Sequence, residues 1–172
     1  MSFKKLALTT ALLASLSGMS VNAMADASQE ITLQGIITST TCDVTVNGGK
    51  SILNVGVFKS VDFAANEKLG SVTMPVALTN CAADETGNLI VQGLTSVKNN
   101  DKNIFVSEDA NTVGFMIADA AGDVITNNQE IEVEAKGGET TEYNFTVGMA
   151  STAVTPKSGA YSAPVLVAYI VE

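Results

Sequence analysis

Apolar and polar residues alternate along many short stretches of the chain, which is the pattern of half-buried β-strands. Residues 129–135 (QEIEVEA) and 141–151 (TEYNFTVGMAS) show it most plainly, and clusters of Gly, Asn and Asp between the stretches predict turns. The expected strands are residues 30–38, 42–46, 51–58, 71–81, 88–94, 103–107, 112–119, 129–135, 141–151 and 161–172. Short strands at this spacing predict a single all-β domain, either a sandwich or a barrel.

Three stretches add detail to this pattern. Residues 60–70 (SVDFAANEKLG) are the best helix candidate, at most one or two turns long, with Phe63 and Leu69 facing inward. Pro75 lies within an expected strand and indicates an edge or a bulge. Residues 47–50 (NGGK) predict a hairpin turn. A phosphate-binding loop is disfavoured there, because its first Gly would fall on Val44.

The first residues have the layout of a secretory signal peptide. Lysines near the start are followed by an apolar run over residues 6–21 and by small residues up to Ala25. We expect cleavage after Ala25, which makes residues 1–25 the signal peptide, with cleavage after Ala23 as the alternative. A membrane anchor is disfavoured because the run carries Thr, Ser and Gly. The mature chain is therefore expected outside the cytoplasm.

Composition excludes most enzyme classes. The 172 residues include 18 acidic and nine basic ones, a formal net charge of −9, and no His. Without His, Ser-His-Asp and Cys-His catalysis and zinc sites with imidazole ligands are excluded. Acids at residues 107–109 and 130–134 suggest a carboxylate pair for glycoside hydrolysis, but those of 130–134 alternate with apolar residues and mark a solvated strand face. We expect no enzyme activity, no cofactor and no metal, and nucleic acid is a poor partner for so acidic a surface.

The two cysteines are Cys42 and Cys81. In an exported protein an even pair favours a disulfide bond, with two buried free thiols as the alternative. Such a bond would stabilise the fold by roughly 3 to 4 kcal/mol, because it restricts the unfolded chain.

Three segments together resemble a known family. Residues 31–46 (ITLQGIITSTTCDVTV) hold an alternating strand, a Gly, two apolar residues, a stretch of small residues and the first cysteine. Residues 74–83 (MPVALTNCAA) lead to the second cysteine. At the C-terminus Gly159 is fourteenth from the end, and Tyr169 lies two positions before the place of the family's penultimate aromatic, here Val171. With the signal peptide and the length, this pattern resembles the type 1-like pilins of chaperone–usher fimbriae in Gram-negative bacteria, and among them a major fimbrial subunit.

The resemblance implies an immunoglobulin-like β-sandwich that lacks its last strand. A periplasmic chaperone lends a strand to the resulting groove, and in the fibre the N-terminal extension of the next subunit replaces it. The implied function is a structural pilus subunit that polymerises by donor-strand exchange into surface filaments used in adhesion. The implied partners are other copies of the chain, related pilins, the chaperone, the outer-membrane usher and a host receptor. The implied route passes through the periplasm to a cell-surface fimbrium.

Carried onto this chain, the resemblance makes residues 26–37 the donor segment and residues 38–172 the pilin domain. The side chains expected to enter a neighbour's groove are Ala27, Gln29, Ile31 and Leu33. The residues expected to contact the chaperone or the next subunit are Gly159, Val165, Val167, Tyr169 and Val171. Two alternatives stay open: a complete sandwich whose first and last strands are simply buried, and a single-domain fimbrial adhesin that binds a host glycan or protein.

Overall fold

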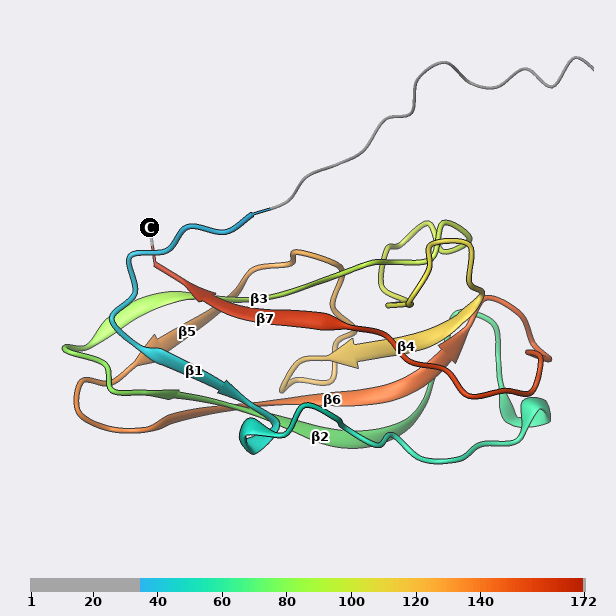
Figure 1. Cartoon of the computed structure of the whole chain (residues 1–172), viewed down its shortest axis with the longest axis horizontal. Helices are drawn as coiled ribbons and strands as arrows, with labels where there is room; N and C mark the ends of the chain where they lie inside the picture. The colour runs from blue at the N-terminus through green and yellow to red at the C-terminus, as the bar shows by residue number, and fades with distance from the viewer. Residues whose placement is uncertain (1–34, 172) are drawn as a thin grey trace, which may run out of the picture. The chain divides into compact units, whose positions relative to one another are not determined.

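The computed structural model of the chain describes residues 35–171, which form two antiparallel β-sheets packed face to face (Figure 1). The first sheet has the order β1-β2-β6-β4 and the second the order β5-β3-β7. The strands are β1 (Asp43–Val46), β2 (Lys68–Thr79), β3 (Glu85–Gly93), β4 (Val113–Ala118), β5 (Ile131–Ala135), β6 (Thr141–Ser151) and β7 (Val165–Ile170). Two short 3-10 helices, η1 (Asn47–Gly49) and η2 (Ser60–Asp62), complete the elements. The predicted all-β sandwich is confirmed.

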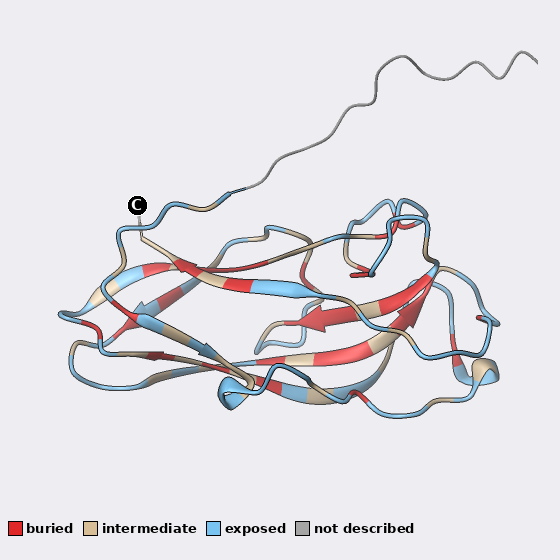
Figure 2. Cartoon of the chain, viewed as in Figure 1, coloured by how far each residue is buried: buried red, intermediate tan, exposed pale blue. Residues whose placement is uncertain are grey.

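The core lies between the two sheets and is filled by the alternating apolar residues of the strands. In β2 the inward side chains of Met74, Val76 and Leu78 are buried, while the residues between them are half-buried. The largest fully buried side chains include Phe105, Phe145 and Tyr169. Figure 2 shows β4 and β6 buried over much of their length, whereas the start of β7 is exposed.

The helix expected at residues 60–70 is wrong, although its inward Phe63 is buried. Only η2 is helical there, and β2 begins at Lys68. Between them the chain joins the end of β6, because the Asn66 N–H donates to the Ser151 carbonyl oxygen at 2.7 Å. Asn66 also has a φ of 60°, which a right-handed helix does not allow. Tertiary pairing therefore outweighs the local helix preference.

Residues 84–88 (DETGN) are one of the Gly, Asn and Asp clusters for which turns are predicted, and the turn is wrong here because β3 already begins at Glu85. Gly87 pairs within the sheet opposite Val133 of β5. A Cβ atom at Gly87 would lie 2.8 Å from the ring of Tyr169, so the glycine lets that side chain pack across β3. Here Gly marks a close approach inside a strand and not a turn.

Two expected strands have no ladder of their own. Residues 51–58 lack strand pairing, and within residues 103–107 only Phe105 forms isolated bridges, to Thr95 and Phe115. Alternation identified both as strand-like, but it cannot show whether a partner strand lies alongside. The expected strand at residues 30–38 lies mostly outside the described residues. Of the edge or bulge expected at Pro75, the structure has the edge. The last pair between β1 and β2 is Val46 with Val76, so Pro75 has no partner on the β1 side.

No helix within residues 35–171 is long and apolar enough to cross a membrane.

Candidate functional site

An apolar groove runs along the edge of the sandwich. It consists of two adjoining cavities of about 580 and 550 Å³. Both cavities are lined by Ile52, Leu53, Val55, Phe115 and Tyr161, so they form one continuous depression, called here the edge groove.

Two stretches of chain that lack strand pairing form the walls of the edge groove. One wall is the lip segment, residues 50–58, and the other is the β7 approach, residues 156–164, which leads into Val165. Within the described residues no backbone hydrogen bond joins residues 51–58 to another segment, and β7 pairs only with β3. Backbone groups that have lost water without gaining a partner are unfavourable, so such walls favour a strand lying between them.

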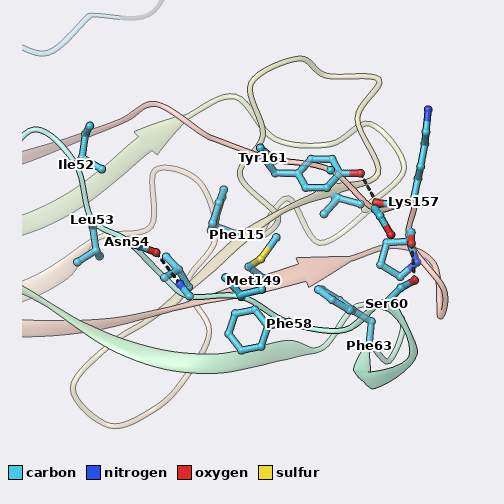
Figure 3. A pocket seen from close by; sticks show the side chains of 18 residues that line it. Ile52, Leu53, Asn54, Phe58, Ser60, Phe63, Phe115, Met149, Lys157 and Tyr161 are labelled. Carbon is cyan, nitrogen blue, oxygen red and sulfur yellow. Dashed lines mark hydrogen bonds between the residues drawn. The ribbon is translucent and has the colours of Figure 1, made fainter.

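The floor of the edge groove is apolar. It is built by β4 and β6, through side chains that include Phe115 and Met149 (Figure 3), and by Met74 of β2. Leu53, Val55 and Phe58 of the lip segment also pack against the core. Ile52 and Val57, by contrast, are 79% and 99% exposed. The sandwich therefore leaves part of its core side chains facing an open depression.

The rim of the edge groove is basic. Among residues 35–171, Lys50 and Lys157 are the charged residues that line it, and no acidic side chain of this range lines either cavity. Both lysines are exposed. In a chain with twice as many acidic as basic residues, this placement favours a segment that carries negative charge.

The predicted contact residues divide between the edge groove and the core. Gly159 and Val165 line the groove, and Val165 is 36% exposed. Val167 and Tyr169 lie on the same face of β7 but are buried in the core. Val171 is half-buried beyond the end of β7. The predicted donor residues Ala27, Gln29, Ile31 and Leu33 lie outside the described residues, so their role stays a prediction.

Tyr169 connects β7 to both other strands of its sheet. Its hydroxyl lies 3.2 Å from the carbonyl oxygens of Glu85 and Val133, either of which accepts its proton. Burial, together with the nearby Glu85 carboxylate, raises the pKa of Tyr169 above its ordinary value. Tyr169 therefore contributes to the stability of the strand that borders the groove.

Tyr169→Phe is expected to lower the free energy of unfolding by about 1 to 2 kcal/mol, because it removes the donor of a buried hydrogen bond to a carbonyl oxygen. Because the folded-state pKa is raised, this stabilisation is complete below the unfolded pKa of about 10 and is lost as the pH rises further. Urea unfolding at neutral pH and above pH 10 measures both effects. Tyr161→Phe is the control, since its hydroxyl donates to the Lys157 carbonyl oxygen near the surface. Equal stability of the two variants would contradict the assignment.

The chain that precedes β1 is fastened at one end of β7. Ser39 donates to the Val171 carbonyl oxygen from its hydroxyl at 2.9 Å, and the Val171 N–H donates to the Thr38 hydroxyl at 3.1 Å. Thr40 and Thr41 donate from their hydroxyls to the Glu85 carboxylate. These contacts fix where the N-terminal segment leaves the domain.

The predicted disulfide between Cys42 and Cys81 is present. It joins the start of β1 to the end of β2. Nearby, a hydrogen bond from the Gly137 N–H and the Lys136 ammonium group lower the pKa of Asp84, and Asp84 in turn raises the pKa of Lys136. Both side chains are exposed, so this ion pair adds little to stability. In the described part of the chain no cluster of His, Cys, Asp and Glu is suited to hold a metal ion.

Sequence comparison supplies the class to which this open-edged sandwich belongs. Residues 31–171 match the model of a family described as Fimbrial protein. No curated protein sequence matches the chain.

Several solved structures share the fold. A type I fimbrial protein and antigen of Burkholderia pseudomallei is 17% identical with a TM-score of 0.55, over 77% of this chain and 95% of that one. A chaperone–usher pilus, studied for the uncoiling of its rod, is 13% identical with a TM-score of 0.61, over 87% and 98%. The P pilus rod subunit PapA is 13% identical with a TM-score of 0.59, over 75% and 97%. These likenesses establish an immunoglobulin-like sandwich of the pilin type.

The family match covers most of the chain, so the chain belongs to the fimbrial protein family. It is a pilus subunit.

The lip segment, Phe115 and Tyr161 are the groove residues that sequence reasoning missed. The apolar pattern of residues 51–58 predicts an ordinary strand and does not indicate a groove wall. Phe115 and Tyr161 carry no local signal, because only the folded chain brings them together.

Proposed function

We propose that this pilus subunit polymerises by donor-strand exchange into surface filaments used in adhesion. Its donor segment, residues 26–37, enters the edge groove of the next subunit and pairs with the lip segment and β7. The observation that carries the proposal is the edge groove itself, an apolar floor between two stretches of chain that lack strand pairing. During export a periplasmic chaperone fills the same groove until the outer-membrane usher exchanges it for the next subunit.

The donor segment suits the groove in length, polarity and charge. Its alternate residues Ile31 and Leu33 are apolar, and burying one such side chain contributes roughly 1.5 to 3 kcal/mol. Asp26 and Glu30 give the segment negative charge, which complements the basic rim. The nine residues of the lip segment span roughly 30 Å when extended, and the twelve residues 26–37 roughly 40 Å. The donor segment is thus long enough to cover the wall.

Leu33→Asp is expected to abolish filament formation, because a charged side chain would enter an apolar groove without a partner. Gln34→Asp is the matched control. It adds the same charge one residue later, where alternation turns the side chain away from the groove. Electron microscopy of fibres sheared from cells that express each variant gives the result. Normal filaments from Leu33→Asp, or equal loss from both variants, would contradict the proposed donor register.

A further inference from the structure

The start of the lip segment has one hydrogen bond from its own backbone, from the Lys50 N–H to the Asn47 carbonyl oxygen at 3.2 Å. Lys50, Ser51 and Ile52 are all exposed, and none of them packs in the core. Further along, Leu53 and Val55 anchor the lip segment against the core. The backbone at residues 51 and 52 has no main-chain hydrogen bond to another described segment. Some other group must therefore hold this end of the wall.

Asn47 is that group. Its side-chain amide Nδ2 donates to the Lys50 carbonyl oxygen at 3.1 Å and to the Ile52 carbonyl oxygen at 2.9 Å. Asn47 has a left-handed φ of 53°, followed by Gly48 and Gly49 at 59° and 76°. Asn tolerates this conformation better than most residues, and the two glycines allow the chain to turn back beneath the amide. The turn and the amide together aim the lip segment along the groove.

Asn47 also determines which backbone groups of the lip segment are free. In an extended chain the backbone N–H and C=O groups of successive residues point to opposite sides. The Asn47 amide occupies the carbonyl oxygens of Lys50 and Ile52, which are two residues apart and therefore on the same side of the chain. The backbone groups of Leu53 point to the other side, and within residues 35–171 neither Leu53 nor Val55 has a main-chain hydrogen bond to another segment.

We propose that Asn47 is a positioning residue for subunit assembly. It holds the lip segment extended, and it directs an incoming strand to pair with the backbone from Leu53 onward. This inference rests on the proposed donor-strand exchange and adds a residue and a register to it. Asn47 acts through the lip segment and does not supply an apolar contact to the incoming strand.

The test compares two Asn→Asp changes at residues with a left-handed φ, which is 53° at Asn47 and 63° at Asn128. Asn47→Asp removes both amide donors and places a carboxylate beside two carbonyl oxygens. Asn128→Asp adds the same charge at a residue that lines neither cavity, and it keeps the oxygen that accepts a hydrogen bond from the Gln92 side-chain amide at 3.1 Å. Asn47→Ala removes the donors without adding charge. Each variant is made in the disulfide-bonded chain that starts at Asp26 and is mixed, as monomer, with a synthetic peptide that copies residues 26–37.

We expect Asn47→Asp and Asn47→Ala to weaken peptide binding by roughly tenfold, mainly through faster dissociation. Asn128→Asp is expected to change it by less than about twofold, because its charge lies outside the edge groove. In the peptide complex, hydrogen exchange should accelerate at Leu53 and Val55 in the Asn47 variants, whereas a general loss of stability would accelerate exchange in β2 and β6 as well. In the unsubstituted chain, peptide binding should protect the amides of Leu53 and Val55.

Two results would overturn the proposal, and they are distinguishable. If the unsubstituted chain does not bind the peptide, donor-strand exchange fails and the role of Asn47 fails with it. If the peptide binds equally well to the unsubstituted chain and to Asn47→Asp, donor-strand exchange stands and Asn47 does not position the wall.

Discussion

The chain from Ile37 to Glu172 is expected to unfold at a temperature tens of degrees lower than the same chain with residues 26–37 appended after Glu172 through a short flexible linker. The appended copy would fill the edge groove of its own molecule, cover the apolar floor and pair with both walls. A linker makes this binding intramolecular, with an effective concentration on the order of millimolar. A gain on the order of 10 kcal/mol corresponds to tens of degrees for a domain of this size.

The control for this comparison is an appended copy that carries Leu33→Asp and keeps the length and the linker. Calorimetry or circular dichroism of the disulfide-bonded proteins gives the midpoints. If the appended wild-type copy and the control melt at the same temperature as the shorter chain, the sandwich needs no lent strand. Donor-strand exchange would then fail, and a binding site on a self-sufficient domain would become the leading hypothesis.

Replacement of Cys42 and Cys81 together by Ala is expected to lower the free energy of unfolding by roughly 3 to 4 kcal/mol. The disulfide closes a loop of 39 residues and so restricts the unfolded chain. Without the bond the unfolded chain gains conformational entropy, which favours unfolding. For a domain of this size the midpoint should fall by roughly 10 to 20 °C. Both side chains are buried, so Ala is a better replacement than a polar residue.

Adding a reductant distinguishes the effect of losing the disulfide bond from the effect of replacing the two side chains. The unsubstituted chain should lose most of the same stability when it is reduced, whereas the Ala variant should not respond. If reduction leaves the midpoint of the unsubstituted chain unchanged, the disulfide does not contribute to stability as argued. Core packing alone would then hold β1 against β2.

Strands that bury one face could be predicted from the sequence, because alternation is a local property. β5, with Glu132 and Glu134 pointing to water and Val133 to the core, is the simplest case. The disulfide was predictable for a similar reason, since an even pair of cysteines in an exported chain has few other uses.

The edge groove could not be predicted residue by residue, because it lies where no strand of the described chain pairs with the second side of β7. The lip segment alternates like its paired neighbours, and no sequence pattern shows that its backbone lacks a partner. The helix prediction for residues 60–70 failed for a related reason, since Asn66 pairs with Ser151, a residue that is distant in the sequence. Long-range pairing, and not local preference, determines these segments.

The Cys42–Cys81 bond also sets how a filament of such subunits would carry mechanical load. Tension applied through the N-terminal segment enters the domain just before Cys42 and passes through the covalent bond to the end of β2. β2 lies inside its sheet between β1 and β6, so the force spreads into paired strands on both sides. The four residue pairs between β1 and β2 are thereby shielded from peeling. Under load the disulfide would therefore keep the first strand of each domain attached to its sheet.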